Sequence, residues 1–267
     1  MPTAGPLHLA IVSDPPQPSA ALLPRLSPAE RAEARRRTGT AQRHFVLGRL
    51  AAHAAIRRVL RATAHHAPAE VVTGPAGEPQ VRGDGTPYCL SVSISHVGRM
   101  AAACAWRSAS DYAAGIDLER VRRTEVAQSG YAFSARERAL LAHVTQGPVL
   151  AGLAAWAVKE AVWKALWPHQ PPSPAAVQIR TLSLAPPRAA ANVECRYLTH
   201  GASTPIRVRL GNIVGADGEY VLAVAEVGRW GSEAPPISRP IDRRHAPIDN
   251  LEVIDDPATV YAEVLDL

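Results

Sequence analysis

Lysine is almost absent from this chain of 267 residues. Lys159 and Lys164 are the only two, although Lys and Arg together number 29, so every other cation is an arginine. A surface that only needed positive charge would use arginine at these positions as well. The two exceptions indicate that a compact ammonium group is needed there instead of a planar guanidinium fork. This bias suggests phosphate chemistry on the segment that contains them.

Cysteine, long apolar runs and aromatic residues are also scarce. The three cysteines, Cys89, Cys104 and Cys195, are odd in number and lack metal-ligand spacing, so we expect buried, reduced thiols in a cytoplasmic protein and no zinc or redox site. No apolar run approaches ~18 residues and no charged segment precedes an apolar one at the start, so we expect neither membrane spanning nor secretion. With aromatic residues at 5%, the core should consist mainly of Ala, Leu and Val.

The length allows one large or two small domains with a packed core. The formal net charge of +5 favours an anionic partner, which leaves nucleic acid, a phosphorylated cofactor and an acidic protein surface open. Few aromatic side chains lie between the arginines. Their scarcity argues against stacking on bases, and therefore against nucleic acid.

Both lysines lie in the segment Trp156–Leu166, whose pattern predicts a helix. Trp156, Glu160 and Lys164 recur every four residues and would share one face, flanked by small apolar residues that allow close packing. An ordinary amphipathic helix with a Glu-Lys pair four residues apart would show the same pattern. A second motif is needed to choose between these interpretations.

The segment from Tyr112 to Glu119 supplies that motif, because apolar and acidic residues alternate with the period of a half-buried strand. Asp117 and Glu119 would then face the same way, with Cα atoms roughly 6.5 to 7 Å apart. With Glu160 as a third carboxylate they would form an all-oxygen site of the kind that Mg²⁺ prefers, with Mn²⁺ as a possible substitute. An exposed strand face that simply carries two acids is the alternative.

The first half should contain a strand at residues 7–13, a short helix from Ser27 and a long helix from about residue 40 to 62. Ser27-Pro-Ala-Glu30 has the form of a capping box with proline in the first turn. Arg37, Arg43 and Arg49 belong to the densest basic cluster of this half. They are either solvated helix surface or bidentate phosphate ligands.

An alternating strand from Cys89 should end at Ser95 and His96, just before Gly98. This places a hydroxyl and an imidazole at the edge of a sheet, where ligands commonly bind. A structural hydrogen-bonding role for His96 is the alternative. The next strand, at residues 100–106, is expected to turn back into the Asp117 strand as a hairpin.

Phe133-Ser-Ala-Arg-Glu137 begins another helix, and Ser134 and Glu137 have capping-box spacing, so a purely structural cap is one interpretation of Glu137. A long helix at 149–166 should follow, and then four strands of a second sheet. We expect these strands at residues 177–184, 192–198, 206–210 and 220–227. No repeat of fixed period is visible.

From Gly231 onward the chain is rich in proline and acid, with eight Asp and Glu against three Arg. Such a composition indicates a poorly ordered or loosely docked extension. Its last stretch, residues 260–267, has the length of a short strand or helix.

Taken in chain order, four motifs resemble those of the 4′-phosphopantetheinyl transferases: Ser95-His96, Gly115-Ile-Asp-Leu-Glu119, Phe133-Ser-x-x-Glu137 and Trp156-x-x-Lys-Glu-Ala161. The resemblance is to the long, monomeric class that activates surfactin synthetase and similar megasynthases, because more than a hundred residues precede the Gly-Ile-Asp motif. It implies an α+β fold built as a pseudo-twofold pair of similar subdomains, with coenzyme A bound between them. We expect subdomains at 1–113 and 114–230 and a tail at 231–267.

The activity that the resemblance implies is Mg²⁺-dependent transfer of 4′-phosphopantetheine from coenzyme A to a serine of an acyl or peptidyl carrier protein. Adenosine 3′,5′-bisphosphate would be released. Carrier proteins are generally acidic, which agrees with the positive charge of this chain. The alternatives are a non-catalytic module that binds nucleic acid or an acidic protein, and a metal-dependent phosphohydrolase.

Residue by residue, the resemblance assigns Asp117, Glu119 and Glu160 to a Mg²⁺ ion that also binds the pyrophosphate of coenzyme A. Glu160 and Lys164 would act in the transfer step. Lys164 would neutralise charge on the phosphates, and Lys159 would support the phosphates as well. A metal and two ammonium groups suffice for phosphoryl transfer, which depends mainly on positioning and charge neutralisation.

The remaining assignments concern the nucleotide and the carrier protein. Ser95 and His96 would hold phosphate oxygens, and Glu137 would be a base for the carrier serine. The chain departs from the family at Gly77-Glu78-Pro79, where a basic residue is usual in the middle position. Gly77 and Pro79 are still expected to line the adenine, but the 3′-phosphate needs another cation. The candidates for it are Arg37, Arg43 and Arg49.

Overall fold

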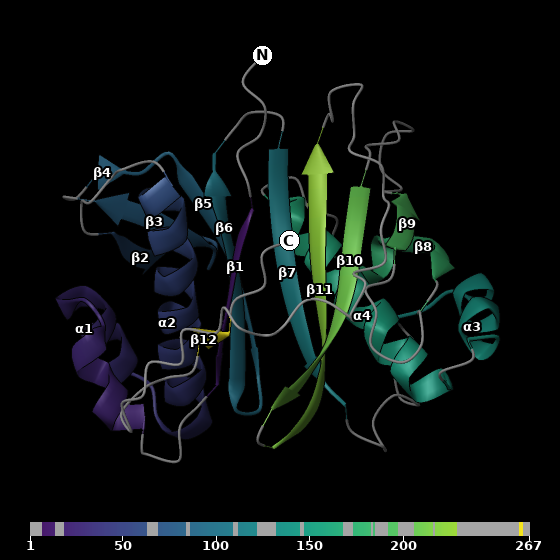
Figure 1. Ribbon diagram of the computed structural model, residues 1–267, viewed down its shortest axis with the longest axis horizontal. Helices are drawn as coiled ribbons and strands as arrows, with labels where there is room; N and C mark the ends of the chain where they lie inside the picture. Colours follow the sequence, from purple (N-terminus) through teal and green to yellow (C-terminus); the bar gives the residue numbers. More distant parts are fainter. Residues whose placement is uncertain are drawn as a thin grey trace, which may run out of the picture. The chain divides into compact units, whose positions relative to one another are not determined.

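The computed structural model describes residues 7–13, 19–62, 69–83, 86–108, 112–121, 132–144, 147–167, 173–182, 184, 192–196, 206–215, 217–228 and 262–263. The chain divides into two compact units (Figure 1). The N-terminal unit consists of residues 2–109 together with 248–267, and the C-terminal unit of residues 110–247. Both contain helices and antiparallel strands, so the α+β fold class is confirmed.

The main sheet of the N-terminal unit is antiparallel, with strand order β12-β1-β6-β5. Its strands are β1 (His8–Ser13), β5 (Leu90–Val97), β6 (Met100–Arg107) and β12 (Ala262–Glu263). A second sheet consists of β2 (Glu70–Thr73), β3 (Pro79–Gly83) and β4 (Thr86–Pro87). Because β12 pairs with β1, the strand alternative for the last stretch of the tail is confirmed for two residues. The rest of the predicted tail lies outside the described residues.

Three helical segments belong to the same unit: η1 (Ser19–Arg25), α1 (Pro28–Arg35) and α2 (Gly39–Ala62). α2 lies across the main sheet and contacts β1, β5 and β6 (Figure 1). Alanines on α2 and on β6 make this approach possible, because their short side chains let helix and strand come close. Three alanines of α2 are fully buried: Ala51, Ala52 and Ala55. The alanine-rich core expected from the composition is therefore confirmed.

The sheet of the C-terminal unit has the order β7-β11-β10-β9-β8 and is also antiparallel. Its strands are β7 (Tyr112–Arg120), β8 (Gln178–Leu182), β9 (Asn192–Arg196), β10 (Ile206–Gly215) and β11 (Gly218–Gly228). Its helical segments are α3 (Ala135–Ala142), α4 (Pro148–Ala165) and η3 (Pro174–Ala176). α4 packs on β7 and β11 with the small-residue flank that the sequence predicted, since Ala157, Val158, Ala161 and Val162 are fully buried.

Each unit, taken by itself, follows the same plan. In the N-terminal unit the first strand pairs with the last long strand, and that strand pairs with the one before it (β1-β6-β5). The C-terminal unit repeats this order as β7-β11-β10, and in both units a short capped helix precedes a long helix that lies on these strands. The sequence showed no repeat of fixed period, so this structural repeat is visible only in three dimensions.

The hairpin expected between residues 100–106 and the Asp117 strand is wrong. β6 pairs with β1 on one side and with β5 on the other, so neither edge of β6 is left for β7. β7 pairs instead with β11, from Tyr112 opposite Gly228 to Arg120 opposite Tyr220. The two strands therefore belong to different sheets.

Cys104 is buried, as expected, but Cys89 is exposed because it lies just before β5 begins. Both are free thiols. The side chain of Cys195 lies outside the described residues. In the described part of the chain, no helix is both long enough and apolar enough to cross a membrane.

Candidate functional site

β7 carries Asp117 and Glu119 on the face that α4 covers. In the β7-β11 register, Asp117 lies opposite Ala223 and Glu119 opposite Val221, and both partners belong to the apolar core under α4. Asp117 is 3% exposed, whereas Glu119 is only partly buried. The prediction that both carboxylates face the same way is confirmed, and they face the helix that carries both lysines.

Gly115 lets this strand and this helix come unusually close. A Cβ atom at Gly115 would lie 2.1 Å from the carbonyl oxygen of Ala161 and 2.6 Å from the backbone nitrogen of Ala165. Both distances are far inside van der Waals contact, and neither atom belongs to a side chain that can move away. Glycine at position 115 therefore fixes how near Asp117 lies to the last turns of α4.

Lys164 joins the two elements by charge. Its Nζ lies 2.6 Å from Asp117 Oδ1 and 3.5 Å from Glu160 Oε2. Burial alone would lower the pKa of Lys164, but Asp117 and Glu160 outweigh that effect and raise the pKa above its usual value. The ammonium group therefore stays charged between two carboxylates.

Glu119 and Glu160 complete the cluster. The pKa of Glu119 is raised to about 7, mainly by burial and then by the negative charges of Asp117 and Glu160, while Lys164 and a hydrogen bond from Trp156 oppose the rise. Burial also raises the pKa of Glu160, against the opposing effect of Lys164. Three carboxylates thus converge near one ammonium group, which leaves an excess of negative charge.

The donor set of this cluster fits a hard divalent cation, because it offers carboxylate oxygens and neither thiolate nor imidazole. Even so, the part of the chain that the structure describes contains no group of three or more His, Cys, Asp or Glu side chains arranged to hold a metal ion. In the conformation described here, Lys164 provides the counter-charge of Asp117 and Glu160.

Residues 113–225 match the family model of the 4′-phosphopantetheinyl transferase superfamily. This match includes β7, α3 and α4, and hence all three candidate metal ligands and both lysines. We call these residues the superfamily domain. No curated protein matches the chain.

Glu137, the candidate base of the superfamily domain, is a helix cap in this structure. Ser134 and Glu137 form the capping box at the start of α3, with Ser134 N donating to Glu137 Oε2 at 2.8 Å and Glu137 N donating to Ser134 Oγ at 3.2 Å. Oε1 also accepts from Ile179 N at 2.9 Å. Burial alone would raise the pKa of Glu137, but these donors and Lys159 lower it. The structure therefore favours the capping alternative.

Lys159 is the partner of Glu137 and is fully buried. Its Nζ lies 2.8 Å from Glu137 Oε1, donates to Val177 O, and lies 3.5 Å from Ala175 O. The three N–H groups of an ammonium thus each have an acceptor. The expected support of phosphates by Lys159 disagrees with this geometry, because its charge is enclosed by protein groups.

In the N-terminal unit, Arg37 and Arg49 both stack on Phe45. Their guanidinium carbons lie 4.3 and 4.5 Å from the centre of the ring. Arg49 is 8% exposed and donates to Thr73 Oγ1 at 3.0 Å, while its buried Nε has no hydrogen-bond partner among the described residues. Burial lowers the pKa of Arg49, and the positive charge of Arg37 acts in the same direction, while the negative charges of Glu30 and Glu33 oppose it. Arg37 also forms an ion pair with Glu33, with 2.5 Å between Nη1 and Oε1, so two guanidinium groups and one carboxylate lie together at this ring.

His96 at the end of β5 is exposed and stacks on His44 of α2, with ring centres 4.7 Å apart. His44 Nε2 lies 3.1 Å from Gly98 O, whereas Ser95, the neighbour of His96, is buried. His44 is not among the site residues predicted from the sequence. The available signal was its position four residues before Gly48, on the helix face that lies against Ile94 and His96.

Glu78, which stands where the family usually has a basic residue, closes its own turn. Its carboxylate accepts from Ala76 N at 3.0 Å and from Gln80 Nε2 at 2.6 Å. Gly77 has a φ of 89°, which explains glycine at that position, and Pro79 begins β3. The turn leads back to Thr73, the residue that Arg49 contacts.

Proposed function

We propose that this protein is a Mg²⁺-dependent transferase that moves 4′-phosphopantetheine from coenzyme A to a serine of an acyl or peptidyl carrier protein. Adenosine 3′,5′-bisphosphate is the second product. The observation that carries this proposal is the convergence of Asp117, Glu119 and Glu160 around Lys164, inside the residues that match the superfamily. The positive charge of the chain and the ion pair between Lys164 and Asp117 agree with it.

In this proposal Asp117, Glu119 and Glu160 hold Mg²⁺, or Mn²⁺ in its place. When bound, the cation would stabilise negative charge that builds up on the phosphate oxygens. Lys164, whose side chain is 24% exposed, donates to a phosphate oxygen from the same cluster. The bound cation would offset the excess negative charge of the three carboxylates.

The transfer step forms a bond between the serine Oγ and phosphorus and breaks the bond to the adenosine bisphosphate. The serine proton must leave in the same step. Glu137 cannot easily take it, because its acceptors are engaged and its side chain is buried. Glu160 is 24% exposed and lies beside Lys164, so we assign the proton to this carboxylate in addition to its proposed role as a metal ligand.

For the N-terminal unit we propose a nucleotide-binding role. Arg49, with Arg37 beside it on Phe45, is the best candidate for the 3′-phosphate because it combines burial, a fixed position and a donor group without a partner among the described residues. We retain Arg43, Ser95 and His96 as phosphate contacts. Gly77 and Pro79 are retained as contacts of the adenine. The protein would act as a monomer of the long class in the cytoplasm.

An experiment on the intact protein tests the proposal. Purified protein is incubated with an apo carrier protein, coenzyme A and Mg²⁺, and the carrier is weighed by mass spectrometry. We expect a gain equal to one phosphopantetheine group, lost when EDTA replaces Mg²⁺, and a rate that falls as salt rises because the carrier is acidic. An unchanged carrier would contradict the proposal, and release of inorganic phosphate would favour a phosphohydrolase.

A further inference from the structure

Glu137 and Lys159 form a buried pair that holds α3, α4 and β8 together. Glu137 lies in the first turn of α3, and Lys159 lies in α4. Ile179, whose backbone N–H donates to Glu137, lies in β8. Lys159 in addition binds the carbonyl groups of Ala175 and Val177 in the segment before β8. Each N–H group of Lys159 has an acceptor and both oxygens of the buried Glu137 accept hydrogen bonds, so the pair has no free donor for a substrate.

The position of Lys159 is related to the rotation of α4 about its own axis. Successive residues of an α-helix are about 100° apart, so a side chain held on one side determines where its neighbours point. Lys159 is held toward Glu137, while Ala161 and Ala165 lie against Gly115 of β7. Glu160 and Lys164 are thereby presented to Asp117. A small rotation of α4 would separate these groups.

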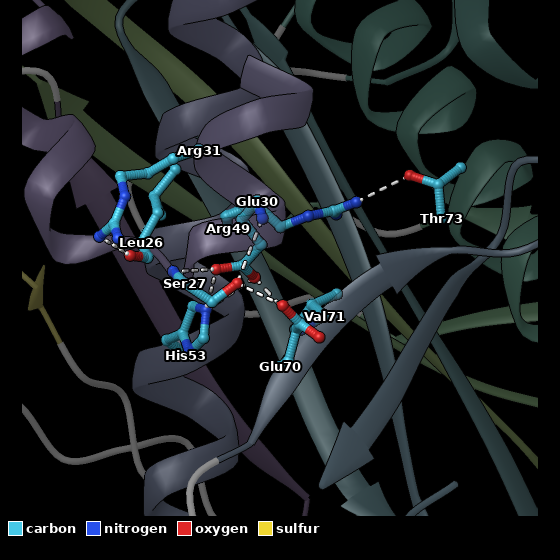
Figure 2. Close-up of polar contacts among 9 residues, drawn as sticks. All are labelled: Leu26, Ser27, Glu30, Arg31, Arg49, His53, Glu70, Val71 and Thr73. Carbon is cyan, nitrogen blue, oxygen red and sulfur yellow. Dashed lines mark hydrogen bonds and ion pairs between the residues drawn. The ribbon is translucent and has the colours of Figure 1, made fainter. Parts of the chain in front are cut away.

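The N-terminal unit contains the same arrangement, shown in Figure 2. Ser27 and Glu30 form the capping box of α1, with Ser27 N donating to Glu30 Oε2 at 2.9 Å and Glu30 N donating to Ser27 Oγ at 3.2 Å. Glu30 Oε1 accepts from Val71 N at 3.1 Å and lies 2.8 Å from His53 Nε2 of α2. The capping serine and the strand N–H contact the same carboxylate oxygens as at Glu137, and His53 takes the place of Lys159 but also lies 2.9 Å from Oε2.

The spacing along the chain repeats as well. His53 follows Glu30 by 23 residues and Val71 follows it by 41, while Ile179 follows Glu137 by 42. In both units the arginine after the glutamate donates to the carbonyl of the residue before the capping serine, from Arg31 to Leu26 and from Arg138 to Phe133. The same hydrogen-bonded arrangement is therefore part of the fold of both units.

Only the capping arrangement of the C-terminal unit involves a long helix that packs on a strand with a pair of carboxylates. In the C-terminal unit α4 packs on β7, which carries Asp117 and Glu119. In the N-terminal unit α2 packs on β1, β5 and β6 of the main sheet, none of which contains Asp or Glu, and it also contacts β2, which has the single acid Glu70. Glu30 thus makes the same kind of contacts in a unit where β1, β5 and β6 carry no acidic residue. The contacts of Glu137 are therefore explained by the fold and do not require a catalytic role.

We infer that Glu137 and Lys159 are positioning residues of the superfamily domain, whose buried ion pair sets the orientation of α4 and so brings Glu160 and Lys164 to Asp117. This inference rests on the proposed function for its metal. It departs from the motif-based assignment of Glu137 as a base and of Lys159 as a phosphate contact.

The test measures metal binding without substrates. Mn²⁺ alone is titrated into the wild-type protein, Glu137→Gln, Lys159→Met and the double variant, and the transfer rate is measured separately. We expect each single variant to bind Mn²⁺ about 10- to 100-fold more weakly, as is usual when a supporting residue of a metal site is lost. The double variant should bind more tightly than either single variant, because it leaves no buried charge without its partner.

Two controls separate orientation from general stability. Ser134→Ala removes a hydrogen bond of the same capping box but keeps the ion pair, and Glu30→Gln disrupts the equivalent arrangement in the other unit. Both should lower the melting temperature and leave the Mn²⁺ affinity unchanged. An equal loss of Mn²⁺ affinity in either control would overturn the inference, because the effect would then follow from stability alone.

The remaining outcomes are equally distinct. If Glu137→Gln keeps its Mn²⁺ affinity, the inference fails, whether transfer is lost, as for a base, or unchanged, as for a simple cap. A wild-type protein that binds Mn²⁺ but does not load a carrier would overturn the proposed function alone. A wild-type protein that binds no Mn²⁺ would overturn both.

Discussion

Lys164 Nζ lies 2.6 Å from Asp117 Oδ1, so the last turn of α4 is joined to the middle of β7 by an ion pair. Asp117 is 3% exposed, and Glu119 and Glu160 add negative charge nearby. Lys164 is thus the cation that keeps three carboxylates together. Any ligand or mutation that changes this balance of charge should change both stability and activity.

Replacing Lys164 with methionine should make the protein depend on a metal for stability. In EDTA we expect Lys164→Met to lose about 1–3 kcal/mol, because a buried carboxylate loses its charged partner. Mg²⁺ should raise the melting temperature of this variant more than that of the wild type, since the metal replaces the missing positive charge. Circular dichroism melts with and without MgCl₂ measure both effects. Equal shifts in the two proteins would count against a shared site.

Asp117→Asn should abolish transfer while the fold remains. The change keeps the volume of the side chain but removes a proposed metal ligand, and we expect the transfer rate to fall about 10²-fold or more. Glu219→Gln, at an exposed position of β11, is the matched control and should transfer at the wild-type rate. Carrier mass spectrometry gives the rate. Normal turnover by Asp117→Asn would refute the metal assignment.

Gly115→Ala should destabilise the protein by about 1–3 kcal/mol through overpacking, because its Cβ would collide with the backbone of α4. Gly211→Ala provides the control, since a Cβ at Gly211 in β10 would meet no atom within 4 Å. Urea denaturation measures both free energies of unfolding. Similar values for the two variants would mean that the close approach at Gly115 does not matter for stability.

Arg49→Met should raise the KM for coenzyme A about 10- to 150-fold and change the KM for dephospho-coenzyme A much less. The variant removes one charged hydrogen-bond donor, which is typically worth about 1.5–3 kcal/mol, from the proposed 3′-phosphate site. Arg36→Met is the control, because the Arg36 side chain is 77% exposed and contacts Glu33. Equal effects of Arg49→Met on both substrates would assign the 3′-phosphate to another cation.

Stability should fall in acid through Glu30 and Glu137. The pKa of each is lowered from 4.5 in the folded protein, despite burial, by the hydrogen bonds and positive charges described above. Their contribution is therefore complete above about pH 4.5, and decreases as the pH falls from that value through the lower folded pKa, because the unfolded chain takes up protons first. Glu137→Gln should flatten this dependence. Free energies of unfolding between pH 3 and 6 provide the measurement, and an unchanged slope would contradict the lowered pKa.

Several elements follow from local sequence alone. The capping boxes at Ser27 and Ser134, the long helix with Trp156, Glu160 and Lys164 on one face, and the strand with Asp117 and Glu119 all form as predicted. Each depends on hydrogen bonds or apolar spacing within a few residues, which the sequence displays directly. The sequence therefore determined which residues carry chemistry and on which kind of element they lie.

Tertiary structure decided which of these residues work together. Nothing in the spacing of Glu137 and Lys159 shows that they neutralise each other in the interior, that His44 stacks on His96, or that β7 pairs with β11 and not with β6. Such pairings depend on which buried donor, acceptor or strand edge remains free once the core has packed. Because every buried polar group needs a partner, that competition is settled only in three dimensions.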